Sequence, residues 1–175
     1  QTAQRLLAEQ HCQGVVAPLE ATVLNINIDR KARLHALWSL LGGKVLSPEF
    51  AEKLLACPDA SIRAWGVRAV GNLHPQHAQL AQQCIGLAQD ASPDVQLQVA
   101  IAAGKLHNID PLPVWVAILA SCGDDPLLPH IVWQNLHPRL PADSDRLLEQ
   151  VADVDLEQAA GLAAMLARVA EKLQD

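Results

Sequence analysis

Seven histidines are the side chains best suited to bind a metal ion in this chain of 175 residues. His74 and His77 form an HxxH pattern, but Pro75 lies between them in an expected loop, so the one-turn spacing of two helical ligands is lost. His130 and His137 are two helical turns apart. A metal site needs three or four converging ligands, and neither pair has a third. We therefore predict no metal site and no cofactor in this chain.

The cysteines and serines give no clear nucleophile. No cysteine belongs to a CxxC or CxxCH pattern, which excludes zinc-ribbon, thioredoxin-like and c-type haem motifs. Since each cysteine lies in an apolar helical context, we expect small buried side chains rather than disulfides. The serines lack a glycine elbow, and no Gly-rich loop for phosphate is present. An enzyme is not expected. The cysteines are Cys12, Cys57, Cys84 and Cys122.

The composition favours an all-helical protein. Half of the residues are hydrophobic but only 3% are aromatic, so Ala, Leu and Val supply the apolar mass. The formal net charge of −6 disfavours non-specific binding to nucleic acid or to anionic lipid. No apolar run approaches the roughly 20 residues of a membrane span. The chain begins at Gln1 with no signal peptide, which suggests a processed chain or an excised domain.

The elements that would position any site recur along the chain. The segments "DRKARLHALWSLLGG", "DASIRAWGVRAVGNL", "SPDVQLQVAIAAGKL" and "DPLLPHIVWQNLHPR" align at spacings of 30, 33 and 33 residues. Apolar residues follow at helical spacing, and second helices are expected over 48–57, 77–89, 111–121 and 144–154. The unit is a helical hairpin, as in a solenoid. We expect Arg33 and Arg63 to reach an acidic cap or a helix C-terminus in the neighbouring repeat. One aligned column contains Arg33, Arg63, Gln96 and Pro129.

Capping residues mark the expected helix starts. In a Ser-Pro or Asp-Pro pair, the Ser or Asp side chain can cap the helix and the proline is the first helical residue. The missing N–H of that proline has no cost, because the first N–H groups of a helix have no partner within it. Asp59 and Asp155 are expected to be further N-caps. The four Ser-Pro or Asp-Pro pairs are at 47–48, 92–93, 110–111 and 125–126.

The pattern Asp/Ser-Pro-x-Val-Arg/Gln before an alanine-rich helix resembles the short HEAT repeat, including the bilin-lyase type. "SPDVQLQVAIAAGKL" and "DASIRAWGVRAVGNL" carry the resemblance, while Pro129 departs from it. The resemblance implies one all-α domain over 1–175, a right-handed α-α superhelix. Its parts are an irregular opening hairpin (1–28), repeats 29–58, 59–91, 92–124 and 125–154, and a capping helix (155–175).

Residues 2–106 also resemble the HEAT segment of large bacterial proteins identified as membrane-bound dehydrogenases. "TAQRLLAEQ", "ARLHALWSLLG" and "IRAWGVRAVG" carry this resemblance. Those proteins join a β-propeller, a HEAT segment and a c-type haem domain. The resemblance implies a non-catalytic scaffold for companion domains or other proteins, in the periplasm or exported; without it, the cytoplasm is expected. The alternative is a fragment of a HEAT-like enzyme such as a bilin lyase.

The second helices are expected to line the inner face, as the resemblance implies. Residues 75–88 and 111–123 contain no Lys, Arg, Asp or Glu, whereas a nucleic-acid groove needs basic residues there. Because "VWVAILA" at 114–120 has no polar residue, we expect the last helix or a partner domain to cover it. The candidate interaction residues are Trp65, Gln79, Gln83, Trp115 and Ile118.

Overall fold

The computed structural model describes residues 13–174, and in this range the regular structure is entirely helical. The predicted all-α class is therefore confirmed, while residues 1–12 of the predicted opening hairpin lie outside the described range. The α-helices are α2 (Gln13–Leu24), α3 (Arg30–Gly42), α4 (Pro48–Leu55), α5 (Ala60–Leu73), α6 (Ala78–Gly86), α7 (Pro93–Ala103), α8 (Pro111–Ser121), α9 (Leu127–Leu136), α10 (Leu140–Val151) and α11 (Ala160–Gln174). A short 3-10 helix, η1 (His137–Arg139), joins α9 to α10.

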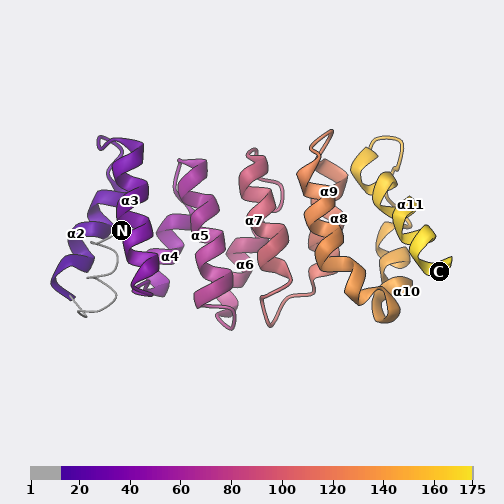
Figure 1. Cartoon of the computed structure of the whole chain (residues 1–175), viewed down its shortest axis with the longest axis horizontal. Helices are drawn as coiled ribbons and strands as arrows, with labels where there is room; N and C mark the ends of the chain where they lie inside the picture. Colours follow the sequence, from indigo (N-terminus) through magenta and orange to yellow (C-terminus); the bar gives the residue numbers. More distant parts are fainter. Residues whose placement is uncertain (1–12, 175) are drawn as a thin grey trace.

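The helices follow one another along the molecule in chain order. Figure 1 shows α3, α5, α7 and α9 in succession along the longest axis, with α2 at one end and α11 at the other. Helix α7 contacts α5 on one side and α9 on the other, and α4 contacts both α5 and α6. Elements that are close in the sequence are therefore also close in space, as the spacing of the repeats predicts.

Polar side chains begin several helices as predicted. Ser47, Asp59 and Asp110 each accept a hydrogen bond from a backbone N–H in the first turn of α4, α5 and α8. Asp125 accepts from two N–H groups at the start of α9. Ser92 occupies the N-cap position of α7, but its side chain makes no capping hydrogen bond. The Ser-Pro and Asp-Pro pairs thus predict where these helices begin, but they do not predict whether the N-cap side chain makes its hydrogen bond.

Two predicted helix starts near the C-terminus are wrong. Asp155 accepts a hydrogen bond from the N–H of Glu157 within a turn, and α11 begins only at Ala160. An Asp side chain caps a turn as readily as a helix, so its type alone does not distinguish the two. Helix α10 begins at Leu140 rather than Ser144, because η1 leads directly into it.

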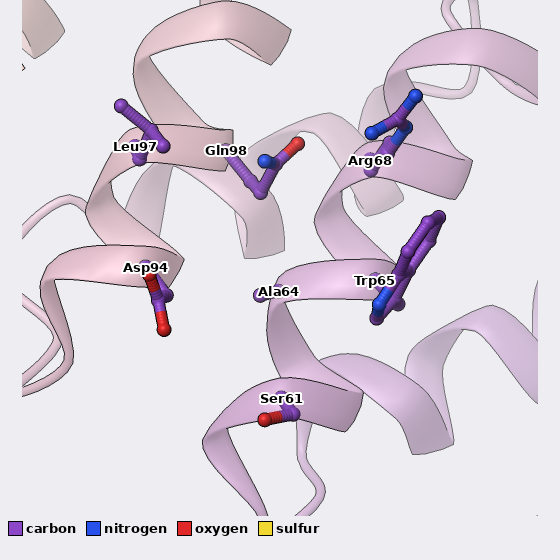
Figure 2. A pocket seen from close by; sticks show the side chains of 7 residues that line it. All are labelled: Ser61, Ala64, Trp65, Arg68, Asp94, Leu97 and Gln98. Carbon is purple, nitrogen blue, oxygen red and sulfur yellow. The ribbon is translucent and has the colours of Figure 1, made fainter. Parts of the chain in front are cut away.

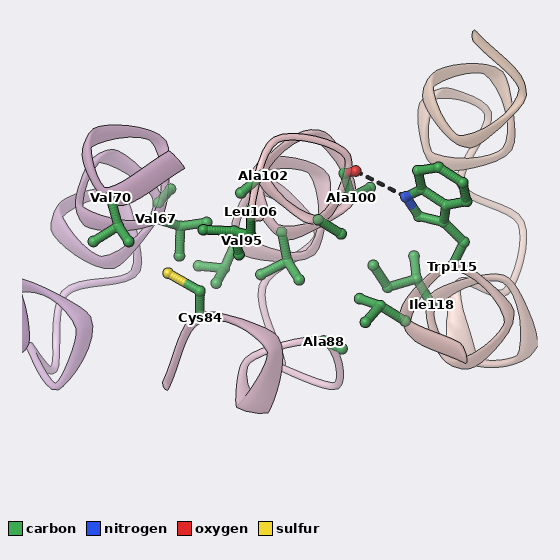
Figure 3. Packing of buried hydrophobic residues seen from close by; sticks show 14 of the residues in the cluster. Val67, Val70, Cys84, Ala88, Val95, Ala100, Ala102, Leu106, Trp115 and Ile118 are labelled. Carbon is green, nitrogen blue, oxygen red and sulfur yellow. Dashed lines mark hydrogen bonds between the residues drawn. The ribbon is translucent and has the colours of Figure 1, made fainter. Parts of the chain in front are cut away.

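Two glycines allow neighbouring helices to approach closely. A Cβ at Gly66 of α5 would lie 2.9 Å from the Cβ of Leu54 in α4, and one at Gly71 would lie 3.1 Å from the Cβ of Ala102 in α7. Around these contacts, Val67 and Cys84 are fully buried between α5, α6 and α7 (Figure 3). The small residues therefore set the distance between successive hairpins.

The aligned polar column joins the repeats through hydrogen bonds. Arg33 Nη1 lies 3.4 Å from Asp59 Oδ2, and Asp59 is the N-cap of α5, which confirms the predicted contact. Arg63 binds both carboxylate oxygens of Asp90, which is two residues before the N-cap of α7 rather than the cap itself. Gln96 donates to the backbone oxygen of Asp90 at 2.9 Å. Three members of the column are therefore structural, because Arg33, Arg63 and Gln96 each tie a helix to a junction between hairpins.

The apolar helix α8 is covered, as predicted, and the cover belongs to this chain. Helices α10 and α11 contact α8, and a Cβ at Gly161 of α11 would overlap the Sγ of Cys122 and lie 3.0 Å from the backbone oxygen of Leu119. Trp115 faces α7 instead: its indole N–H donates to the backbone oxygen of Ala100 at 2.9 Å (Figure 3). The last helix thus covers α8 without the help of a partner domain.

Candidate functional site

The five predicted interaction residues do not share one surface. Trp115 and Ile118 are 1% and 0% exposed, so the prediction that they meet a partner is wrong. The reason is that α8 is enclosed by its own hairpin and by the C-terminal helices. Gln79 and Gln83 are exposed on α6, and Trp65 is half-buried on α5.

The two glutamines lie beside a cleft between α4 and α6. Gln79 Nε2 donates to Glu52 Oε1 at 2.8 Å, which ties the side chain to the neighbouring helix. Gln83 lines the cleft, which encloses about 310 Å³, together with Glu52, Leu55 and Leu87. Neither an aromatic ring nor a cation lines this cleft, so it offers weak anchors for a partner.

Trp65 stands between two other clefts, which share Trp65 and Arg68. The larger cleft, of about 180 Å³, lies between α5 and α7 (Figure 2). The smaller, of about 120 Å³, includes Leu41 of α3 and Asn72 of α5. We call the two together the Trp65 groove. Its lining residues are Leu41, Ser61, Ala64, Trp65, Arg68, Ala69, Asn72, Leu73, Asp94, Leu97 and Gln98.

Contacts on two sides hold the Trp65 ring in place. The edge-to-face partner is Trp38 of α3, whose ring centroid is 5.6 Å away at an interplanar angle of 66°. His35 packs against Trp38 in a similar way at 5.2 Å. The Arg68 guanidinium carbon lies 5.0 Å from the centroid of the Trp65 ring, a cation–π distance. Trp65 is therefore a preorganised aromatic side chain.

Five of the seven described arginines make salt bridges with other described residues, whereas Arg68 and Arg168 do not. Arg68 and Lys105 make no salt bridge with any of residues 13–174; the Lys105 ammonium donates instead to Asn72 Oδ1 at 2.8 Å. Asn72 is one helical turn after Arg68, so the two cations lie at the same end of the groove. Asp94 lies at the other end, beside Ser61 (Figure 2). The salt-bridged arginines are Arg30, Arg33, Arg63, Arg139 and Arg146.

The side chains of the groove offer several groups that can bind a partner. Its lining contains no histidine or cysteine, and the Ser61 hydroxyl accepts a hydrogen bond from Arg30 at 2.9 Å. The remaining side chains offer a ring, aliphatic surface, amides and charges. These are the groups with which proteins recognise peptides.

Two of the histidines and three of the cysteines have structural positions elsewhere in the described chain. His74 Nε2 lies 2.9 Å from the backbone oxygen of Leu46, and His77 Nδ1 accepts from the N–H of Leu80 at the start of α6. Within residues 13–174, no three His, Cys, Asp or Glu side chains are grouped to hold a metal ion. Burial raises the pKa of the Cys84 thiol to about 12, which keeps it protonated and unreactive. Cys57, Cys84 and Cys122 are free and buried, and Cys12 lies outside the described residues.

Sequence reasoning named Trp65 but not its partners in the groove. Two signals could have found them. Arg68 is three residues after Trp65, so the two share a helix face. Gln98 is 33 residues after Trp65, one repeat later in the same aligned column, and such positions lie side by side in stacked repeats.

Comparisons with protein-family models, with curated proteins and with solved structures found no match to this chain. No helix within residues 13–174 combines the length and the hydropathy that a bilayer crossing requires. The groove and the helical repeat are therefore the basis on which a function can be assigned.

Proposed function

We propose that this chain is a HEAT-like α-solenoid, a right-handed superhelix of helical hairpins that acts as a non-catalytic protein-interaction module. Three features support this architecture: the 30- to 33-residue recurrence, the sequential helix contacts and the polar column at the junctions. Solenoids of this kind present extended surfaces on which a partner segment can lie.

The observation that carries the functional proposal is the paired exposure of Trp65 and Arg68 in a groove between successive hairpins. Tryptophan and arginine dominate the energetics of protein interfaces, especially in preformed pockets. Because Trp38 already fixes the ring of Trp65, binding costs little side-chain entropy. The groove runs from α3 across α5 to α7, a course that suits an extended peptide segment.

We further propose that this module is the scaffold segment of a larger redox protein. This proposal rests on the resemblance of residues 2–106 to the HEAT segment of multidomain dehydrogenases. On this proposal the companion domains perform the chemistry and the segment positions them. The sequence on either side of the segment tests it: a β-propeller before and a CxxCH motif after would support it, and unrelated flanking domains would contradict it. No observation favours the alternative of a bilin-lyase-type enzyme.

The experiment that tests the interaction module is a display selection of random 12-residue peptides on the purified chain. Selected peptides are then titrated against wild type, Trp65→Ala and Trp133→Ala. Trp133 is a matched control, because it is also half-buried and also lies under an arginine, Arg168, at 4.2 Å. We expect peptide binding to weaken at least tenfold in Trp65→Ala only. This corresponds to a loss of about 1.4 kcal/mol or more, as truncation of an interface tryptophan typically causes. A selection without binders, or peptides indifferent to Trp65→Ala, would contradict the proposal.

A further inference from the structure

The positive and negative charges of the Trp65 groove lie at opposite ends of it. Acidic residues outnumber basic ones in the chain, 19 to 13, yet the cations at one end of the groove have no acidic partner among residues 13–174. Arg68 and Lys105 supply these positive charges from α5 and from the end of α7. The nearest counter-charge that lines the groove, Asp94, is at the opposite end (Figure 2).

The position of Arg68 favours a carboxylate as its ligand. Its guanidinium carbon lies 5.0 Å from the centroid of the Trp65 ring, and the guanidinium makes no salt bridge with any of residues 13–174. An arginine held in this way keeps the planar fork that matches the two oxygens of a carboxylate. Gln98 faces the cleft from α7, opposite Arg68, and can donate from its amide (Figure 2).

The rest of the groove favours an apolar side chain beside that carboxylate. Trp65 and Leu97 are partly exposed and Ala64 forms the floor between them, so the middle of the cleft is apolar. At the far end the Asp94 carboxylate repels a second acid and can accept from a peptide N–H or a basic side chain. The groove therefore distinguishes the two directions in which a peptide could lie.

We infer that the Trp65 groove binds an extended peptide segment of a partner protein, with an Asp or Glu side chain on Arg68 and an adjacent apolar side chain on Trp65. This inference rests on the proposed function, since it names the chemical class of the peptide. The Lys105 ammonium, which is bonded to Asn72 at the end of the groove, strengthens the preference for acidic sequences through its positive charge.

The test uses the tightest peptide from the display selection and its amide twin, in which each Asp or Glu is replaced by Asn or Gln. Both are titrated against wild type, Arg68→Gln and Arg168→Gln, the last removing an equivalent cation from above Trp133. For both wild type and Arg168→Gln, we expect the amide twin to bind roughly tenfold more weakly than the acidic peptide. The difference corresponds to the loss of one charge-assisted hydrogen bond. In Arg68→Gln most of this difference should be lost, because only the longer-range charge of Lys105 remains, and added salt should weaken the acidic peptide more than its amide twin.

The outcomes separate this inference from the proposed function. Peptides that lose binding in Trp65→Ala but have no acidic preference would overturn the inference and leave the interaction module intact. Peptides indifferent to both Trp65→Ala and Arg68→Gln, or a selection without binders, would overturn both. A second copy of the chain could also occupy the groove, and sedimentation velocity measures this self-association. A dimer that dissociates in Arg68→Gln would also overturn the inference.

Discussion

Replacing Arg63 with alanine removes the most extensively bonded side chain at a junction between hairpins. Arg63 Nε and Nη2 donate to the two carboxylate oxygens of Asp90 at 2.8 and 2.9 Å. Its Nη1 donates to the backbone oxygens of Cys57 and Pro58 at 2.8 and 2.9 Å. The Arg63 side chain is 17% exposed and that of Asp90 is 7% exposed. The substitution therefore leaves a nearly buried carboxylate without its counter-charge.

The expected loss follows from that burial. Removing one partner of a fully buried ion pair costs about 3–5 kcal/mol, because the remaining charge is uncompensated. Asp90 retains one hydrogen bond, from the N–H of Ser92, and Arg63 is partly exposed, so the lower end applies. We expect a loss of about 3 kcal/mol in the free energy of unfolding. For a domain of this length that corresponds to a decrease of roughly 6–12 °C in Tm.

Urea denaturation followed by circular dichroism measures this loss, with Arg30→Ala as the control. Arg30 also binds an aspartate, Asp59, but its side chain is 60% exposed, so its loss should cost no more than about 1 kcal/mol. An equal, small effect of both substitutions would show that the Arg63 contact is solvated and that the column does not hold the repeats together.

The same pair predicts a pH dependence. The hydrogen bonds from Arg63 lower the pKa of Asp90, so the pair stabilises the folded state at pH values above the unfolded pKa of about 3.9. That stability is lost as the pH falls through the lower folded pKa. The difference in unfolding free energy between wild type and Arg63→Ala should be constant from pH 7 to 5 and should shrink below pH 4. A difference that grows in acid would contradict the sign of the shift.

Two further predictions concern close contacts between helices. In urea denaturation, Gly66→Ala should destabilise the protein by about 1–3 kcal/mol, because the added Cβ would press on Leu54. Gly86→Ala is the control: its Cβ would meet open space, so the substitution should be neutral or stabilising by up to about 1 kcal/mol. Gly161→Ala should force α11 away from Cys122 and increase binding of the dye ANS, since α8 loses cover. Equal stability of Gly66→Ala and Gly86→Ala would contradict the contact between Gly66 and Leu54. Unchanged dye binding in Gly161→Ala would contradict the contact between α11 and α8.

The contacts of Arg33 and Arg63 could be predicted from the sequence because both residues fall in one aligned column. Arg33 and Arg63 occupy equivalent helix positions, and each ties its helix to an aspartate at the next junction. The departure in the fourth repeat is also visible, since Pro129 has no side chain with which to make such a bond. Periodicity therefore predicted not only helices but the polar contacts between them.

The contacts of Trp115 could not be predicted from the sequence. An apolar helix must be buried on several sides, and the sequence predicted that burial. Which element covers each side depends on how the chain turns after α10, and no residue pattern specifies that turn. Trp115 thus became a candidate for partner contact, although its indole is bound to Ala100 within the same hairpin.

The groove was only half predictable for a similar reason. Trp65 was predicted as a candidate interaction residue, and the structure places it in a cleft. The contacts that make it rigid involve Trp38 and Arg68, and these depend on side-chain rotamers and on the distance between α3 and α5. Spacing in the sequence limits which residues can meet but does not choose their rotamers.

The most direct measurement of the proposed groove uses the four tryptophan indole N–H resonances, each assigned by a Trp→Phe variant. In a ¹⁵N-labelled sample titrated with the selected acidic peptide, binding in the Trp65 groove predicts a large shift for Trp65 and a smaller one for Trp38, its ring neighbour. Trp115, buried against Ala100, and Trp133 should keep their positions. Shifts confined to Trp133 or Trp115, with Trp65 unchanged under saturating peptide, would show that the partner binds elsewhere.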